Sequence, residues 1–166
     1  MKINKDLQLI VLAPKYVKKK EIDEIVKKNN EWIEKAIEKT SNILKNTLEI
    51  SKEVKDDLRN NAKAVFPRKV DYWCKILNVE AKGVKITSAK TRWGSCSYNN
   101  YINFSLYTML LDDALIDYIV VHELAHIVEK NHSVNFYKVV ESVLPNYKSL
   151  IVKLRKFERE NIIKDI

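Results

Sequence analysis

Three histidines are all that the chain contains, and they lie within eleven positions, at His122, His126 and His132. The first two belong to the run His-Glu-Leu-Ala-His. A spacing of four places both imidazoles on one face of a helix, one turn apart, where both can bind one metal ion. Glu123 lies beside the first histidine and can accept a proton from a water molecule bound to that metal. Zn²⁺ suits this chemistry because it can lower the pKa of a bound water to about 7.

A hydrolytic zinc site needs a third protein ligand, and His132 is the remaining candidate. It follows His126 by six residues, which is about 600° of rotation in a continuous helix and would turn it away from the metal. The helix must therefore end between them. Asn131 tolerates the left-handed conformation that often ends a helix, and Ser133 can cap the next one. The sequence thus predicts that all three histidines bind one Zn²⁺ ion, or another divalent metal, with the adjacent glutamate as general base.

The composition favours a helical domain with short connections. The chain has 166 residues, 46% of them hydrophobic, but only two glycines and three prolines. Its apolar runs fall well below the roughly 18 residues of a membrane span, and residues 7–13 are too short for a signal peptide. Cys74 and Cys96 form neither a CxxC pair nor a disulfide framework. We therefore expect a cytoplasmic protein with no membrane partner.

The net charge of +8 is concentrated in residues 61–100, which hold eight Lys and Arg against two Asp and Glu. This excess suits an anionic substrate or a nucleic-acid surface. Ordinary solvated lysine faces explain it more simply. The sequence has no zinc-finger pattern, no helix-turn-helix signal and no aromatic-rich basic stripe, so nucleic acid is a possible partner but not the favoured one.

Apolar periodicity predicts the elements that must position the histidines. Residues 7–13 are typical of a strand, and residues 21–39 repeat apolar side chains at helical spacing. A second helix is predicted over residues 51–77, where Pro67 should kink or divide it, because proline lacks the amide hydrogen.

In the second half of the chain, the apolar periodicity changes twice, from helical to strand-like and back. Residues 84–89 alternate like a strand with residues 101–104 as partner, and a hairpin or bulged turn is expected between them. The rest of the chain is predicted to be helical, in three segments: 112–129 with an aspartate cap, 133–144, and a last one from 145 that fades by 166.

These motifs resemble the YgjP-like metallopeptidase family, which is related in fold to SprT-like and other zincin proteins. The resemblance covers about residues 7–147 and rests on Arg-Trp-Gly-Ser-Cys-Ser (92–97), Ile-Asn-Phe (102–104), Tyr-Ile-Val-Val-His-Glu-Leu-Ala-His (118–126) and Asn-His-Ser (131–133), with Phe136 and Pro145. It implies an α+β, zincin-like fold, helix-rich with a small antiparallel or mixed sheet packed on the metal-bearing helix. It also implies a zinc ion held by the three histidines.

We expect residues 1–50 to form an N-terminal strand and helix lead-in and residues 51–166 to form the metallohydrolase domain, together one compact unit. The histidine spacing is also that of metzincin proteases, but those have a glycine where this chain has Glu129, and a methionine turn. Met1 and Met109, the two methionines here, both precede the motif. Members of the YgjP-like family usually carry a basic stretch before the first strand, whereas this sequence starts almost at the strand, which would leave out part of a groove wall.

Several other side chains are secondary candidates. Arg92 can hold a substrate carboxylate or phosphate, or form a structural ion pair with an aspartate of residues 112–117. Tyr137 and Tyr101 can donate to a developing oxyanion, or simply pack. The remaining expectations are structural: Trp93 beneath the metal-bearing helix, Cys96 as a small buried residue, and Trp32 and Trp73 in the core.

Three functions remain open from the sequence. The first is a zinc-dependent hydrolase, most simply a metallopeptidase in which a water activated by Glu123 attacks a peptide or amide bond. The second is a zinc-dependent nucleotide phosphohydrolase or pyrophosphatase. The third is a DNA-associated, SprT-like protein. Glu123 argues against a purely structural zinc, which needs no adjacent base and usually has four protein ligands.

Overall fold

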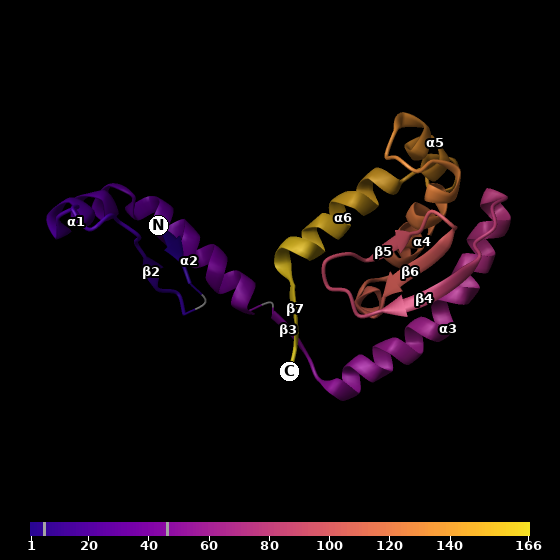
Figure 1. Cartoon of the computed structure of the whole chain (residues 1–166), viewed down its shortest axis with the longest axis horizontal. Coiled ribbons are helices and arrows are strands. Elements are labelled where there is room, and N and C mark those ends of the chain that lie inside the picture. Colours follow the sequence, from indigo (N-terminus) through magenta and orange to yellow (C-terminus); the bar gives the residue numbers. More distant parts are fainter. Residues whose placement is uncertain (5, 46) are drawn as a thin grey trace. The chain divides into compact units, whose positions relative to one another are not determined.

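The computed structural model describes residues 1–4, 6–45 and 47–166. These form two compact units, one of Met1–Leu48 with Glu158–Lys164, the other of Glu49–Phe157 with Asp165–Ile166. Figure 1 shows the elements of both along the chain. Within the described residues, no helix combines the length and the apolar character that crossing a membrane would require.

The smaller unit begins with two short strands and two helices. β1 (Lys2–Ile3) pairs antiparallel with β2 (Leu9–Ile10), and α1 (Lys19–Lys28) precedes α2 (Asn30–Lys45). The strand predicted over residues 7–13 is therefore limited to two residues, and the helix predicted over residues 21–39 is two helices. The break falls at Asn29, whose side chain and backbone N–H both turn back to Ile25 O.

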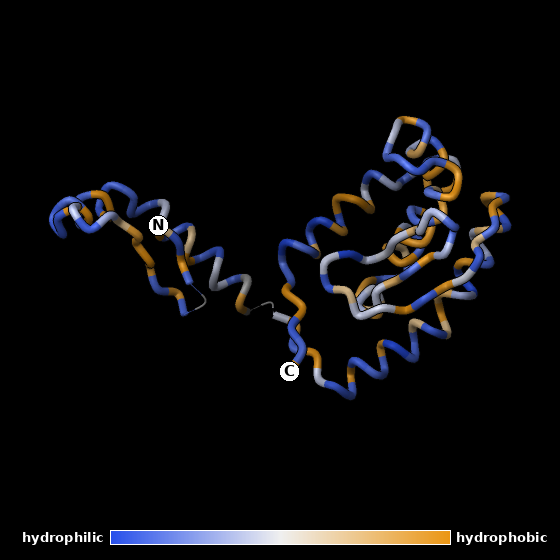
Figure 2. The backbone as a smooth tube through the Cα atoms, in the orientation of Figure 1, coloured by the Kyte–Doolittle hydropathy of each residue, from blue (hydrophilic) through white to orange (hydrophobic). Residues whose placement is uncertain are grey.

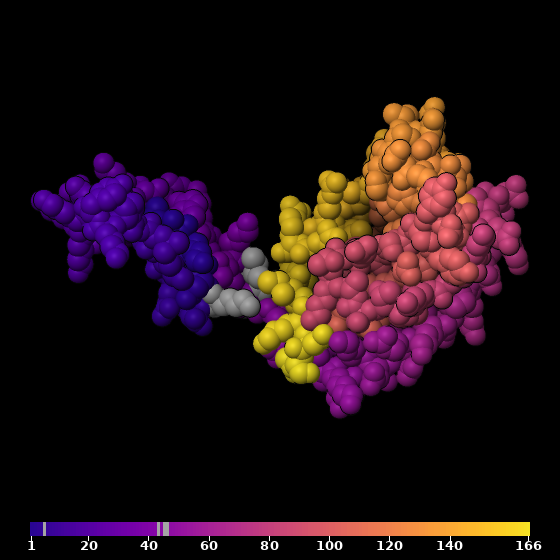
Figure 3. Space-filling model, in the orientation of Figure 1, coloured from indigo at the N-terminus to yellow at the C-terminus, as the bar shows by residue number. Residues whose placement is uncertain are grey.

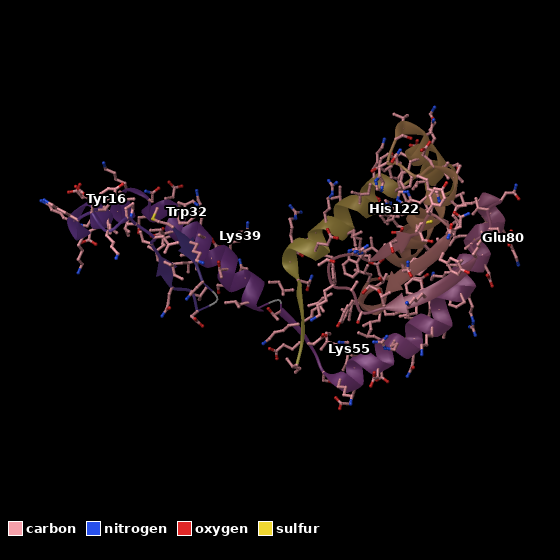
Figure 4. All side chains as sticks on the ribbon, in the orientation of Figure 1. Tyr16, Trp32, Lys39, Lys55, Glu80 and His122 are labelled. Atoms are coloured by element: carbon pink, nitrogen blue, oxygen red, sulfur yellow. The ribbon has the colours of Figure 1, made fainter. Side chains whose placement is uncertain are left out.

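Trp32 was expected in the core, but this is wrong, because 45% of its surface is exposed. It lies on α2, where charged residues surround it in the sequence, and Figure 4 labels it with Tyr16 of the same unit. Trp73, by contrast, is buried as expected.

The end of the chain also differs from its prediction. α6 (Tyr147–Glu160) is followed by a strand, β7 (Ile162–Asp165), which pairs with β3 (Thr47–Ile50). The segment 162–165 alternates exposed and half-buried residues, a pattern of two that suits a strand. Residue 165 is held in place by Lys55 and by the hydroxyl of Tyr107.

α3 (Lys52–Leu77) is one continuous helix, so Pro67 does not divide it. Ser51 caps its first turn by accepting from the N–H of Val54. Its buried face consists of Leu58, Ala62, Phe66, Val70 and Trp73. Because this face continues on both sides of the proline, packing against the rest of the unit outweighs the lost hydrogen bond.

The larger unit contains a mixed three-stranded sheet of order β4-β6-β5. β4 (Gly83–Thr87) runs parallel to β6 (Tyr101–Ser105), and β5 (Gly94–Cys96) runs antiparallel to it. The two predicted strands do pair, but in parallel, so the hairpin expected between them is wrong. The hairpin instead joins β5 to β6, with Asn100 in a left-handed conformation (φ 61°) at its turn.

The metal-motif helix lies at the centre of this unit. α4 (Asp113–Val128) is capped by Asp112 and is preceded by the 3-10 helix η1 (Leu106–Leu110). Nine of its residues are buried, as expected for a central helix. α5 (Val134–Val143), capped by Ser133, and α6 follow. Figure 2 shows hydrophobic residues recurring along α3 and α6 between hydrophilic ones, as in helices with one buried face.

One face of the sheet is covered by helices. Ile102 and Phe104 of β6 are fully buried on that face, and the ring of Phe104 stacks on Phe66 of α3 at 4.1 Å between centroids. The fold is thus helix-rich α+β with a small mixed sheet packed on the central helix, as the sequence predicts.

Candidate metal centre

α4 and the turn after it bring the three histidines together. His122 and His126 lie one turn apart on α4, which ends at Val128, and Glu129 turns out of the helix in an extended conformation (φ −133°, ψ 111°). His132 then returns toward α4. The helix ends where the sequence predicted. Asn131, however, is not among the described non-glycine residues with positive φ, so it does not adopt the left-handed conformation.

The ligand atoms of the three rings face one another. One nitrogen of each histidine lies within 4.8 Å of the other two. His122 Nε2 and His132 Nε2 are 3.0 Å apart, a separation that lets both bind one ion at Zn–N distances of about 2.0–2.1 Å. Nδ1 of His126 lies 3.2 Å from the carbonyl oxygen of Glu129. This contact fixes the ring and leaves its Nε2 free for a metal.

Aromatic packing holds the rings in these orientations. Phe136 of α5 is fully buried and lies 4.6 to 5.0 Å, between ring centroids, from all three histidines. His132 itself is exposed, so the site opens to solvent on that side. Figure 4 labels His122 on the helix ribbon of the larger unit.

The electrostatics of the site suit metal binding. Burial, reinforced by the two other histidines, lowers the pKa of His122 to about 4. Its imidazole is therefore neutral near pH 7 and has a lone pair to donate. Nδ1 of the same ring is buried and has no hydrogen-bond partner among the described residues. Three imidazoles with an open side are a donor set that fits zinc.

Glu123 lies buried against β5. The backbone N–H of Cys96 donates to its carboxylate, and burial raises its pKa to about 7 against the effects of that bond and of Arg92. A Cβ placed on Gly94 would lie 2.7 Å from Cγ and from Oε1 of Glu123. The glycine at this position therefore makes room for the carboxylate.

A small cavity adjoins these groups. It has a volume of about 140 Å³ and is lined by Trp93, Gly94, Tyr118, Ile119, His122, Glu123 and Leu154. Trp93 thus lies next to the metal-motif helix as expected, with its ring 5.9 Å from that of Phe157. Tyr118, whose ring is 5.9 Å from His122, was missed by the sequence reasoning, although its place four residues before His122 puts it on the ligand face.

The secondary candidates lie at different distances from the site. Tyr137 of α5 stacks on Tyr147, with its ring 6.3 Å from His132. Tyr101 is half exposed and packs over Gly83 at the start of β4. Cys96, expected to be buried, is only partly buried, and it does not belong to the histidine cluster.

Arg92 is exposed and lines a second cavity. It does not form the ion pair that was expected with an aspartate of residues 112–117. The three aspartates of that segment have lysine partners instead. Asp113 and Asp117 both bind Lys69, and Asp112 binds Lys153.

The chain belongs to the YgjP-like family. Residues 44–157, more than half of the chain, match the family described as YgjP-like, metallopeptidase domain. The comparison with curated proteins gave no match.

Two solved structures share the fold. The metallopeptidase zymogen abylysin of Pyrococcus abyssi is 23% identical, with a TM-score of 0.53, over 59% of this chain and 99% of that one. The metallopeptidase zymogen jannalysin of Methanocaldococcus jannaschii is 22% identical, with a TM-score of 0.50, over 55% of this chain and 94% of that one. The expected family and fold are thereby confirmed, and the chain is a member of a metallopeptidase family.

Proposed function

We propose that the chain is a zinc-dependent metallopeptidase whose activity resides in residues 51–166. His122, His126 and His132 would hold the ion and Glu123 would act as general base. One observation carries this proposal: three imidazole nitrogens converge within 4.8 Å beside a buried carboxylate. A purely structural site would have no use for that carboxylate.

The histidines, Glu123 and the residues of β5 would have different roles in the reaction. A zinc ion bound by the histidines would acidify a water molecule and polarise the scissile carbonyl. Glu123 takes the proton of the attacking water and later passes it to the leaving amine. Gly94 and the Cys96 N–H hold that carboxylate against β5, so that it need not reorganise during the reaction.

The outer edge of β5 supports a polypeptide substrate. Ser105 donates to Trp93 O, and Ser97 donates to Tyr101 O, so alternate residues from 93 to 97 bond to β6. The backbone N–H and C=O groups of Gly94 and Cys96 accordingly face away from β6, and the Cys96 N–H donates to Glu123. An extended peptide that pairs with the Gly94 end of this edge would lie beside the general base.

The two structural neighbours are metallopeptidase zymogens, which favours this proposal over the nucleotide alternative. The test is mass spectrometry of products after zinc-loaded protein meets a mixed pool of unfolded polypeptide and nucleotides. Peptide fragments that disappear with Glu123→Gln support the peptidase. Release of phosphate or pyrophosphate that depends on Glu123 would instead establish a nucleotide hydrolase.

The control for this experiment is zinc content. Glu123→Gln should retain the metal, because the glutamate is not among the three converging ligands. A variant that keeps its zinc and still cleaves at the wild-type rate would contradict the role of Glu123.

A further inference from the structure

Two cavities flank the strand that borders the metal centre, and they differ in chemistry. The first is the cavity of about 140 Å³ beside Glu123, and the second, of about 280 Å³, is lined by Thr87, Ala89, Arg92, Gly94, Ser95 and Asn103. Gly94 belongs to both. We propose that the two cavities select polypeptides in which a bulky apolar residue stands next to an acidic one at the cleavage site. This inference rests on the peptidase function proposed above.

The cavity beside Glu123 suits an apolar side chain. Apart from the metal ligand and the base, its walls are Trp93, Tyr118, Ile119 and Leu154, with the backbone of Gly94. For comparison of size, a dry cavity of about 150 Å³ lined by Leu, Ile and Phe holds a benzene ring. A leucine or phenylalanine side chain is therefore of the right size, and its burial there would place the scissile bond next to the base.

The second cavity suits a carboxylate. Arg92 supplies its positive charge, and Ser95 and Asn103 supply polar groups, with Asn103 Nδ2 donating to Ser95 Oγ at 3.2 Å. No acidic side chain is among its lining residues. An exposed guanidinium beside neutral polar groups can bind a substrate carboxylate through two parallel hydrogen bonds.

The two cavities open on opposite faces of the sheet. Ile102 and Phe104 point to the helix-covered face, and Phe104 stacks on Phe66 there. Asn103, between them in the strand, points to the other face, where the second cavity lies. The first cavity lies on the helix side, since α4 and α6 both contribute to it.

The positions of the two cavities explain why the apolar and the acidic residue would be neighbours in the substrate. Successive side chains of a strand point to opposite faces, so a peptide paired with the outer edge of β5 presents neighbouring side chains to the two faces on which the cavities open. Neighbouring side chains of the substrate would thus contact different cavities, one with apolar walls and one with a basic wall. The pair is adjacent in the substrate sequence because Gly94 separates the cavities.

The segment that forms both walls is firmly held. Ser105 Oγ donates to Ala89 O at 2.6 Å, Thr108 Oγ1 donates to Trp93 O at 3.1 Å, and Ser105 N–H donates to the same carbonyl at 2.8 Å. Ser105 and Thr108 are themselves buried. The spacing of Arg92 and Trp93 is therefore fixed before a substrate arrives, which lowers the entropic cost of binding. Figures 1 and 3 show this segment at the surface of the larger unit beside α6.

The test uses the zinc-loaded full chain and a set of fluorogenic peptides that differ at two adjacent positions. The first position carries Leu or Gly and the second Asp or Lys. We expect Leu-Asp peptides to have the highest kcat/KM and a change from Asp to Lys to cost about tenfold or more, the range of a charge-assisted hydrogen bond. Arg92→Glu should reverse the Asp-over-Lys preference.

Matched variants separate charge from position. Lys63→Glu, on the exposed part of α3, makes the same change of charge far along the sequence from the cavity and should leave the preference intact. Leu154→Trp fills the apolar cavity and should lower the Leu-over-Gly preference about tenfold, with zinc content unchanged. Binding of labelled peptides to Glu123→Gln, followed by fluorescence anisotropy, should show the same order without turnover.

The experiment distinguishes failure of the peptidase function from failure of the paired-cavity inference. If no peptide is cleaved or bound, the peptidase function itself is wrong. If peptides are cleaved in a Glu123-dependent manner with equal rates for Asp and Lys, or with a preference that Arg92→Glu leaves unchanged, the peptidase stands and the paired-cavity inference is overturned.

Discussion

Gly94 of β5 lies against the carboxylate of Glu123, and a Cβ at this position would come within 2.7 Å of Glu123 Cγ and Oε1 and 2.9 Å of Cδ. Such distances are shorter than van der Waals contact. Glu123 is buried and receives the N–H of Cys96 two residues further along β5, so it has little room to move aside. The need for glycine here comes from this close approach, since its backbone φ is not positive.

Gly94→Ala should therefore lower kcat by about tenfold or more while zinc stays bound, because it displaces the general base, whose contribution is typically about 10²–10⁴-fold. The measurement is kcat with zinc content determined on the same sample. The matched control is Gly83→Ala at the other glycine of the chain, where the added Cβ meets only the Tyr101 ring, at 3.1 Å. That variant should keep wild-type kcat. Equal losses in both would point to a general loss of packing.

His132→Ala should weaken zinc binding by at least about tenfold, since outer partners of a metal site already contribute about 10–100-fold and a direct ligand contributes no less. His132 comes from the turn after α4 and its Nε2 lies 3.0 Å from that of His122. Competition with a chelator followed by metal analysis measures the affinity. Asn131→Ala, an exposed neighbour in the same turn, should retain zinc. Retention of zinc by both variants would remove His132 from the ligand set.

The histidine cluster could be predicted from the sequence because its information is local. The spacing of His122 and His126 fixes their common face, and the caps Asp112 and Ser133 mark where helices begin. Tyr118 could have been found by the same periodicity. Glu123 was expected beside the metal, but its contact with Gly94 depends on how β5 packs against α4, which no local pattern contains.

Expectation and structure differ where tertiary packing outweighs local preference. Pro67 does not divide α3, because Phe66 and Val70 are buried on either side of it. The parallel pairing of β4 with β6 leaves β5 to form the hairpin, and strand direction is not encoded in alternation. The sequence 162–165 forms a strand because it finds a partner in β3, 112 or more residues earlier in the chain.

Asp117→Ala should destabilise the larger unit by about 1–3 kcal/mol, because it removes the acceptor of a half-buried network. Its Oδ1 accepts from Trp73 Nε1 at 2.9 Å and from Lys69 Nζ at 2.7 Å, and its side chain is 24% exposed. Asp113→Ala removes a second partner of the same lysine, but that side chain is 80% exposed, so its loss should cost less than about 1 kcal/mol. Urea unfolding of both variants measures the difference, and equal effects would contradict the role of burial.

Asp165 should make the stability of the chain fall in acid. Hydrogen bonds from Lys55, then Tyr107, then Lys90 hold the pKa of this carboxyl well below its usual range. A carboxyl with a depressed folded-state pKa stabilises the fold above its unfolded value of about 3.9, and this contribution is lost as the pH falls toward the folded value. Asp165→Asn should therefore lower the free energy of unfolding at pH 7, and its deficit relative to wild type should shrink below about pH 4.

Urea unfolding at pH 7, 5 and 3 measures this deficit. Asp57→Asn, an exposed carboxyl on α3, makes the same substitution away from the cluster and should give a deficit near zero at all three values. A deficit for Asp165→Asn that is constant from pH 7 to pH 3 would mean that shape rather than charge holds β7 in place. A deficit that shrinks in acid assigns the effect to the ionised carboxylate of Asp165, which pairs with Lys55 at the start of α3 and with Lys90, close to Arg92 in the sequence.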